Sequence, residues 1–231
     1  MKCKVAVIGA GRMGSIVANQ LPDDVEKLII DTDFAKAKAV AEGCGAAASD
    51  QMSAASDADV ILVVLPTPAV APAGAAAAEI AKDGALIVNM ATKGNFSPET
   101  VAAHPALSMF DAKIIGHANS MRLGAPCYVV VNTESEAEFE TVAHVLSGYK
   151  KVVRGDSSLV PLINSIGSGE GVRAAVKCRK LLKQYNIPKE WEDIVIYTVC
   201  AGTMRSYVDN DLGEFARVLA DKMEAEEGLN D

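Results

Sequence analysis

The sequence is poor in the residues that mark several common classes of protein. Aromatic side chains make up 5% of its 231 residues, with a single tryptophan, and there are three histidines. Acidic residues outnumber basic residues by 30 to 22, which gives a net charge of −8. Because a nucleic-acid-binding protein needs a basic face to neutralise phosphates, this balance argues against nucleic acid as a partner.

Cysteine and the other metal-binding residues are also sparse. The five cysteines are widely spaced and include no Cys-x-x-Cys pair. An odd number of scattered thiols predicts reduced cysteines in a cytoplasmic protein rather than a disulfide framework. The histidine, aspartate and glutamate positions form no cluster with ligand spacing, so we expect no metal site.

Long hydrophobic runs are absent as well. The first apolar run, Val5–Ile8, stops at Gly9, which is too short for the core of a signal peptide. The alanine-rich stretch 69–81 contains Pro72, Gly74 and Glu79 and is not apolar enough to span a bilayer. We therefore expect no membrane segment.

What the chain does contain, over residues 1–155, is an alternation of short apolar runs and helical patterns. Such runs suit strands buried on both faces of a parallel sheet, and their alternation with helices is typical of βαβ units. The predicted helices are Arg12–Gln20, Phe34–Glu42, Ala71–Ala81 and Glu134–Leu146. The predicted strands are Lys4–Ile8, Lys27–Asp31, Val60–Leu65, Leu86–Asn89, Lys113–Ile115, Tyr128–Asn132 and Lys151–Arg154.

Residues 156–231 lack strand patterns and predict a small all-helical domain. The expected helices are Ser168–Tyr185, Lys189–Val208 and Asp211–Glu226, with Asp211 as the cap of the third. We place the domain boundary near Gly155. The helices carry apolar stripes that need a partner helix, which favours a homodimer formed through this domain. These stripes contain Leu181, Leu182, Ile194, Ile196, Val199 and Val218.

A glycine motif follows the first strand. Gly9-Ala10-Gly11-Arg12-Met13-Gly14 fits the pattern G-x-G-x-x-G between a strand and a helix. Gly9 permits the tight turn, Gly11 lets the backbone approach a pyrophosphate, and Gly14 lets the helix pack closely on the strand. The helix dipole and free N–H groups favour the diphosphate. The motif therefore predicts a doubly wound Rossmann sheet that binds NAD or NADP, with Arg12 and Met13 in the binding loop.

Asp31 ends the second predicted strand, 22 positions after Gly9, close to the spacing of about 20 expected for the acid that binds the adenosine ribose. Its carboxylate would repel a 2′-phosphate, so NAD is favoured over NADP. Arg12, Thr32 and Lys36 could hold a 2′-phosphate if Asp31 turned away. Asp33 is expected to cap the next helix.

Two further strand ends should flank the cofactor, because ligands of open α/β sheets lie beyond the carboxyl ends of the strands. Leu65, Pro66 and Thr67 follow one strand. Asn89 and Ala91 follow the next, where we expect the nicotinamide.

Segments along most of the chain resemble the pyrroline-5-carboxylate reductase family. They are Gly9–Gly14, Asp59–Pro66, His117–Ser120 with Gly124, and Val145–Arg154 followed by Ile166–Gly171, which resembles the Gly-Ser-Gly start of the family's dimerising helix. The resemblance implies reduction of the C=N bond of a small imino acid by NADPH or NADH, a homodimer, and a place near the substrate for Ser168. Glu170 and Gly171 replace the family's Pro-Ala, and its carboxyl-terminal Gly-Gly-Thr-Thr is missing.

The candidate catalytic residues are His117, Asn119 and Ser168. Asn119 and Ser120 could donate hydrogen bonds to the substrate or the nicotinamide amide, and Ser168 could instead cap its helix. Ile115-Gly116-His117 more weakly resembles prephenate dehydrogenases, in which a histidine assists oxidation of a hydroxyl. Two alternatives thus stay open: oxidation of a hydroxy acid with His117 as base, and an NAD(H)-binding regulatory protein without turnover.

Overall fold

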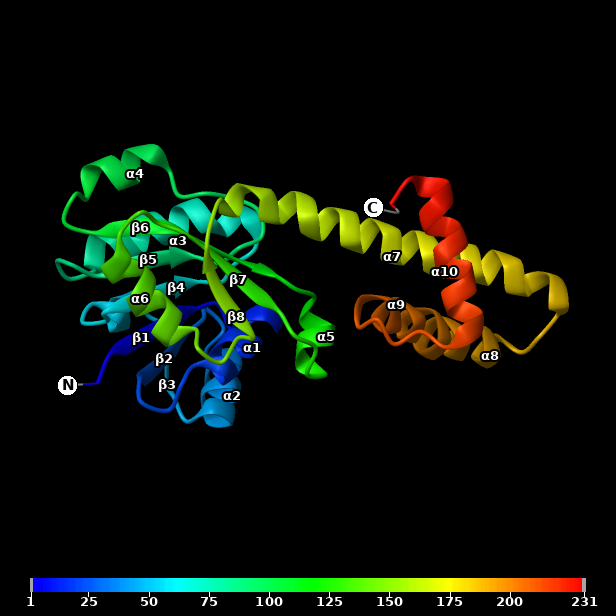
Figure 1. Ribbon diagram of the computed structural model, residues 1–231. Helices are drawn as coiled ribbons and strands as arrows, with labels where there is room; N and C mark the ends of the chain where they lie inside the picture. The colour runs from blue at the N-terminus through cyan, green and yellow to red at the C-terminus, as the bar shows by residue number, and fades with distance from the viewer. Residues whose placement is uncertain (1, 230–231) are drawn as a thin grey trace. The chain divides into compact units, whose positions relative to one another are not determined.

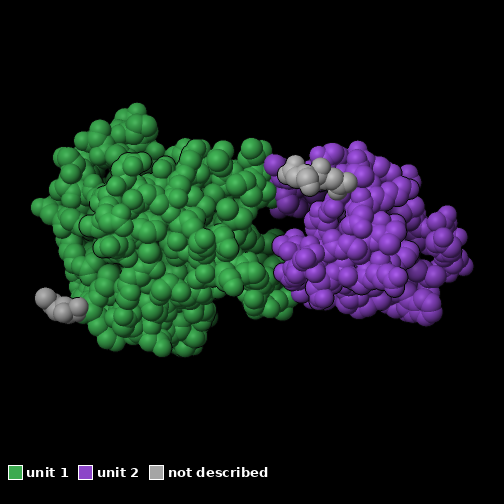
Figure 2. All heavy atoms as spheres, in the orientation of Figure 1, with its two compact units in different colours: residues 1–164 green, residues 165–231 purple. Residues whose placement is uncertain are grey.

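The computed structural model describes residues 2–229, and the chain divides into two compact units, residues 1–164 and 165–231 (Figure 2). The division falls inside one long helix, α7 (Val160–Leu182), a few residues beyond the boundary expected near Gly155. Across residues 2–229, no helix has the length and apolar character needed to cross a membrane.

The first unit is built on one eight-stranded sheet with the order β3-β2-β1-β4-β5-β6-β7-β8 (Figure 1). All neighbouring strands are parallel except β6 and β7, which are antiparallel. The order reverses at β1, so this is the doubly wound Rossmann sheet that the sequence predicts. The strands are β1 (Lys4–Ile8), β2 (Glu26–Ile30), β3 (Ala47–Ser49), β4 (Val60–Val63), β5 (Leu86–Asn89), β6 (Ser108–Ile115), β7 (Tyr128–Asn132) and β8 (Lys151–Arg154).

Helices cover both faces of this sheet. Successive side chains of each strand point to opposite faces, so each buried strand contributes to a core on either side. On one face, Val7 and Leu62 share a core with Val17 of α1 and Val142 of α6. On the other, Ile61 packs with residues of α3. The helices of the unit are α1 (Arg12–Gln20), α2 (Phe34–Cys44), α3 (Thr67–Ile80), α4 (Pro98–Ala103), α5 (Ala118–Arg122) and α6 (Glu136–Val145).

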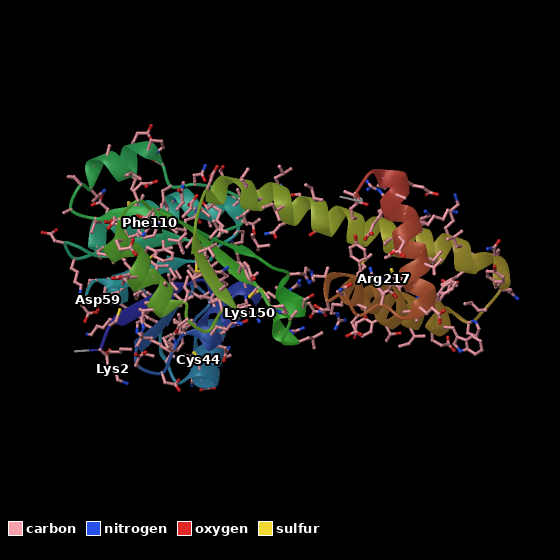
Figure 3. The ribbon with its side chains drawn as sticks, in the orientation of Figure 1. Lys2, Cys44, Asp59, Phe110, Lys150 and Arg217 are labelled. Carbon is pink, nitrogen blue, oxygen red and sulfur yellow. The ribbon has the colours of Figure 1, made fainter. Side chains whose placement is uncertain are left out.

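Charged residues gather at the amino-terminal edge of the sheet, opposite the glycine loop. Asp59, labelled in Figure 3, lies just before β4. Its carboxylate accepts hydrogen bonds from the Lys4 amide at 2.7 Å and from Lys82 Nζ at 2.6 Å. Burial raises the pKa of Asp59, but these two hydrogen bonds and the nearby cations outweigh it and hold that pKa below its usual value.

Several expected boundaries were wrong in the first unit. Helix α3 begins at Thr67 rather than Ala71, because Pro68 is well placed in a first helical turn. Strand β6 begins at Ser108 rather than Lys113, since its first half is only partly buried and shows no apolar run. The sequence pattern did not indicate β3, α4 and α5, all of which are short.

The second unit holds most of α7, a second helix and α10 (Glu214–Glu227). The second helix runs over Lys189–Val208 as expected, as α8 (Lys189–Ile194), a π-helical segment (Val195–Cys200) and α9 (Ala201–Val208). Arg179 of α7 is hydrogen-bonded to Glu192 and Asp193 and so ties α7 to α8.

In this unit, the expected helix start at Ser168 was wrong, and so was the expected cap at Asp211. Helix α7 begins at Val160, eight residues before Ser168, so Ser168 lies in the helix interior and cannot cap it. Helix α10 begins at Glu214 with Gly213 at the N-cap position, so Asp211 does not cap it. By contrast, Asp33 caps α2 as expected, accepting from the Lys36 amide.

Candidate cofactor-binding site

The glycine loop joins β1 to α1, and its three glycines meet different surroundings. A Cβ on Gly9 would lie 2.4 Å from the Val64 carbonyl oxygen, and Gly9 has a φ of +107°, which other residues rarely adopt. A Cβ on Gly14 would lie 1.8 Å from the Gly9 carbonyl oxygen. Gly11 has open space around it. Gly9 and Gly14 therefore shape the loop, and Gly11 leaves it accessible.

The amino terminus of α1 opens on that accessible side. Gly11 occupies the N-cap position and, having no side chain, accepts no capping hydrogen bond from the first N–H groups of the helix. The helix has nine residues. Its free N–H groups and its dipole therefore make a site suited to the negative charge of a diphosphate.

A first cavity, of about 330 Å³, lies on the β2 side of the loop. Met52, Pro72 and Ala73 give it an apolar wall, while Asp31 and Asp50 place two carboxylates at it. Among the described residues that line this cavity, none is basic. The complete lining is Ile8, Gly9, Ile30, Asp31, Thr32, Asp50, Met52, Leu65, Ala69, Pro72 and Ala73.

The Asp31 carboxylate is held in place at this cavity. Its Oδ2 accepts from the Ala10 amide at 2.7 Å, and its Oδ1 accepts from the Asp33 amide at 2.9 Å. Lys36 forms an ion pair with Asp33 at 3.0 Å and does not line the cavity. The cavity therefore suits a ribose with free hydroxyls better than one carrying a phosphate.

A second cavity, of about 230 Å³, lies at the carboxyl ends of β4 and β5 and beside the start of α1. Leu65 lines both cavities, so they lie next to each other along the sheet edge. Arg12 is the one titratable side chain among the described residues of its lining. That lining comprises Gly11, Arg12, Met13, Val64, Leu65, Pro66, Met90, Ala91, Thr92 and Ile114.

Most of the predicted cofactor residues meet at these two cavities. Gly9, Asp31, Thr32 and Leu65 line the first, and Gly11, Arg12, Met13, Leu65, Pro66 and Ala91 line the second. Gly14 shapes the loop from behind.

Two predicted residues, Thr67 and Asn89, are next in sequence to lining residues but do not line either cavity themselves. The Thr67 hydroxyl donates to the Lys93 carbonyl at 3.2 Å, and Asn89 is fully buried with its amide used in internal hydrogen bonds.

The residues that sequence reasoning missed follow no motif. Asp50 and Met52 sit after the short β3, and Pro72 and Ala73 lie inside α3. Ile114 comes from the end of β6. The rule that ligands lie beyond the carboxyl ends of strands could have indicated Ile114, but nothing in the pattern indicates the others.

The candidate catalytic residues are divided between the two units. His117 and Asn119 are exposed at the start of α5, which packs against α1. His117 Nδ1 is 3.4 Å from the Ser120 hydroxyl, and Asn119 Oδ1 accepts from Arg122 at 2.6 Å, which leaves the Asn119 NH₂ free. Ser168 is exposed in the second unit.

The described residues contain no group of three or more histidine, cysteine or acidic side chains arranged to hold a metal ion. All five cysteines are free thiols.

Part of the chain matches a known protein family. Residues 4–93 match the family described as NADP oxidoreductase, coenzyme F420-dependent. Every residue that lines the two cavities, apart from Ile114, lies in that segment. None of the curated proteins matches the sequence.

Solved structures share the fold over almost the whole chain. A pyrroline-5-carboxylate reductase from Coxiella burnetii has a TM-score of 0.72 at 13% identity, covering 96% of this chain and 85% of its own. A 3-hydroxyisobutyrate dehydrogenase from Salmonella typhimurium gives 0.66 at 24% identity, covering 91% and 80%. A reductive aminase from Aspergillus terreus, in complex with NADPH and ethyl-5-oxohexanoate, gives 0.62 at 20% identity, covering 96% and 79%. These similarities confirm the Rossmann sheet with a helical carboxyl-terminal region.

Proposed function

We propose that this chain is an NAD-dependent oxidoreductase that transfers hydride between nicotinamide and the C=N bond of a small imino acid. The observation that carries the proposal is the pair of adjoining cavities on either side of Leu65, with the open Gly11 and the uncapped start of α1 beside them. A dinucleotide has two nucleoside ends and a central diphosphate, which this arrangement suits. The family match over residues 4–93 supports an oxidoreductase.

The choice of NAD over NADP rests on charge. Asp31 and Asp50 line the first cavity, where the adenosine ribose would lie, and a 2′-phosphate would face both carboxylates. Two unit charges of the same sign repel each other at short range, even in a partly solvated site. Structures of similar fold hold either coenzyme, since the reductive aminase is in complex with NADPH and the V8 variant of an imine reductase from Myxococcus stipitatus is in complex with NAD⁺.

The preference for an imine substrate rests on how few proton-transfer groups face the second cavity. Hydride adds to the carbon of a protonated C=N bond, the π electrons move to nitrogen, and the product is an amine and oxidised nicotinamide. An iminium ion is already electrophilic, so the protein mainly has to orient it. The lining of this cavity supplies orientation through apolar side chains and Thr92, with Arg12 positioned to bind an anionic group.

The test is turnover with a panel of imino acids and hydroxy acids, followed through nicotinamide absorbance. We expect NADH oxidation with a cyclic imino acid and a lower rate with NADPH. Oxidation of hydroxy acids alone would instead support the dehydrogenase reading with His117 as base. Binding of NADH without turnover of any compound would support the regulatory reading.

We also propose that the second unit forms a homodimer with a second copy of this chain. None of its hydrophobic residues described between 165 and 229 is buried. Phe215 is 80% exposed and Tyr197 65%. A groove of about 800 Å³ between α7, α9 and α10 is lined mainly by apolar side chains, including Val199, Met204 and Leu219.

An unpartnered helical unit of this size would bury too little apolar surface to offset its conformational entropy, whereas a second copy supplies a matching apolar face. Sedimentation equilibrium tests this proposal, and a monomer at micromolar concentration would contradict it. We also propose that the reaction takes place in the cytoplasm, a reducing compartment that would keep the five widely spaced cysteines as thiols.

A further inference from the structure

Buried and partly buried polar side chains form a row from the end of β5 to the middle of β6, in the first unit. Asn89 is the last residue of β5 and pairs in register with Asp111 of β6. Lys113 follows two residues later on the same face of β6. Asn89 and Lys113 are two of the four buried polar residues described in the chain. Burying a polar group costs free energy of folding unless the group is hydrogen-bonded or paired, so the partners of these side chains matter.

The Asn89 amide links strand, loop and neighbouring strand. Its Nδ2 donates to Asp111 Oδ1 at 2.8 Å and to the Gly94 carbonyl at 2.9 Å. Its Oδ1 accepts from the Ala91 amide at 3.0 Å. An ionised carboxylate can only accept, so Asp111 fixes the orientation of the Asn89 amide together with the two loop groups: Nδ2 faces Asp111 and the Gly94 carbonyl, and Oδ1 faces the Ala91 N–H. With the amide reversed, the Ala91 N–H and the Gly94 carbonyl would both lose their partners.

Lys113 forms an ion pair with the Asp111 carboxylate. Its Nζ is 3.1 Å from Asp111 Oδ2, and its side chain is 4% exposed. An ammonium group buried to this degree needs an opposite charge beside it, and Asp111 supplies that charge. In return, the Lys113 ammonium group balances the negative charge of the Asp111 carboxylate beside it.

The loop that Asn89 holds is the one that reaches the second cavity. Met90, Ala91 and Thr92 line that cavity. At its far end, Gly94 has a φ of +92°, and a Cβ there would lie 3.1 Å from the Thr67 carbonyl. The loop therefore fits closely between the start of α3 and the end of β5, and a small rotation of Asn89 would move the cavity wall.

We infer that Asp111 and Lys113 are positioning residues, which act through Asn89 to hold the Met90–Gly94 loop against the nicotinamide end of the cofactor. The inference rests on the proposed function for the identity of the ligand. It differs from a purely stabilising role, in which the ion pair would strengthen the sheet and leave the loop unchanged.

The first experiment uses the protein without cofactor, so it does not depend on the proposed function. Hydrogen exchange is measured at the Ala91 amide in the wild type, in Asp111→Asn, which keeps the shape and removes the charge, and in Lys113→Met. We expect protection at Ala91 in the wild type and exchange about tenfold faster in both variants, because each loosens the Asn89–Ala91 hydrogen bond. The matched control is Lys38→Met, which removes an exposed lysine paired with Glu42 on α2 and should exchange like the wild type.

The second experiment measures the Kd for NADH and the melting temperature of the same proteins. We expect the Kd for NADH to rise about tenfold in either variant and no further in the double variant. The reason is that both changes break the same relay, that is, the series of contacts from Lys113 through Asp111 and Asn89 to Ala91. Wild-type exchange at Ala91 with wild-type Kd and a lower melting temperature would overturn the inference in favour of simple stabilisation. Failure of both variants to fold would also overturn it, since a relay that only orients a loop leaves the sheet intact. If the wild type binds no NADH, the proposed function fails, while exchange at Ala91 still decides whether the relay holds the loop.

Discussion

The glycine loop permits a prediction in which two substitutions of the same chemistry have different outcomes. Gly14→Ala should damage both the fold and cofactor binding, because the new Cβ would lie 1.8 Å from the Gly9 carbonyl oxygen. Gly11→Ala should damage cofactor binding alone, because a Cβ there meets open space in the protein itself. That space is where a diphosphate would approach the backbone.

The size of each effect follows from the geometry. For Gly14→Ala, α1 must withdraw by about 1.6 Å to reach ordinary contact with Gly9. Overpacking of this kind costs about 1–3 kcal/mol, or about 3–10 °C in melting temperature for a domain of this size. For Gly11→Ala, a similar clash with the diphosphate would raise Kd for NADH about ten- to hundredfold without a change in melting temperature.

Thermal unfolding and fluorescence titration with NADH measure the two effects on the same samples. Gly43→Ala is the matched control, since Gly43 lies exposed in α2 with open space around it. Better helix propensity should leave that variant as stable as the wild type or up to about 1 kcal/mol more stable, with unchanged Kd. Wild-type affinity in Gly11→Ala would refute the reasoning, because the backbone would then not lie against the cofactor.

Four further outcomes are expected. Asp31→Ser should narrow the preference for NADH over NADPH by about tenfold, since one of two carboxylates at the first cavity is removed; an unchanged ratio would contradict its role. His117→Asn should keep most of the imine-reducing rate, whereas a loss of about a hundredfold or more would show that a base is required. Met204→Asp, in the apolar groove, should shift sedimentation from dimer to monomer, and an unchanged dimer would place the interface elsewhere. The lowered pKa of Asp59 means that its stabilising effect is present above its unfolded pKa and is lost as pH falls through its folded pKa. Lys82→Met should therefore lower the free energy of unfolding at neutral pH by less than about 1 kcal/mol for this half-exposed pair, seen as a slightly lower melting temperature, and leave it unchanged in acid.

The sheet and the glycine loop could be predicted from the sequence because their signals are local. Unbroken runs such as Val60–Leu65 are dictated by burial on both faces, and the strand–loop–helix order fixes what Gly9 and Gly14 must do. Where burial is partial, as in the first half of β6, the pattern fades and the predicted boundary was wrong. Short elements such as α5 have too few residues to show a period.

The cavity walls could be predicted only where a strand end supplies them. Met52 and Pro72 are brought together by tertiary packing between the 3₁₀ helix Met52–Ala55 and α3, which no spacing rule encodes. Asn89 shows a different limit. Its position after a strand indicates a place near the ligand, but its buried amide serves the backbone of the next loop, and that role depends on Asp111 of a strand far along the chain.

Isothermal titration of the folded protein with NADH and NAD⁺ tests the central claim most directly. We predict saturable binding of one dinucleotide per chain, competed by ADP-ribose and weaker for NADPH. A folded protein that takes up none of these dinucleotides would contradict it.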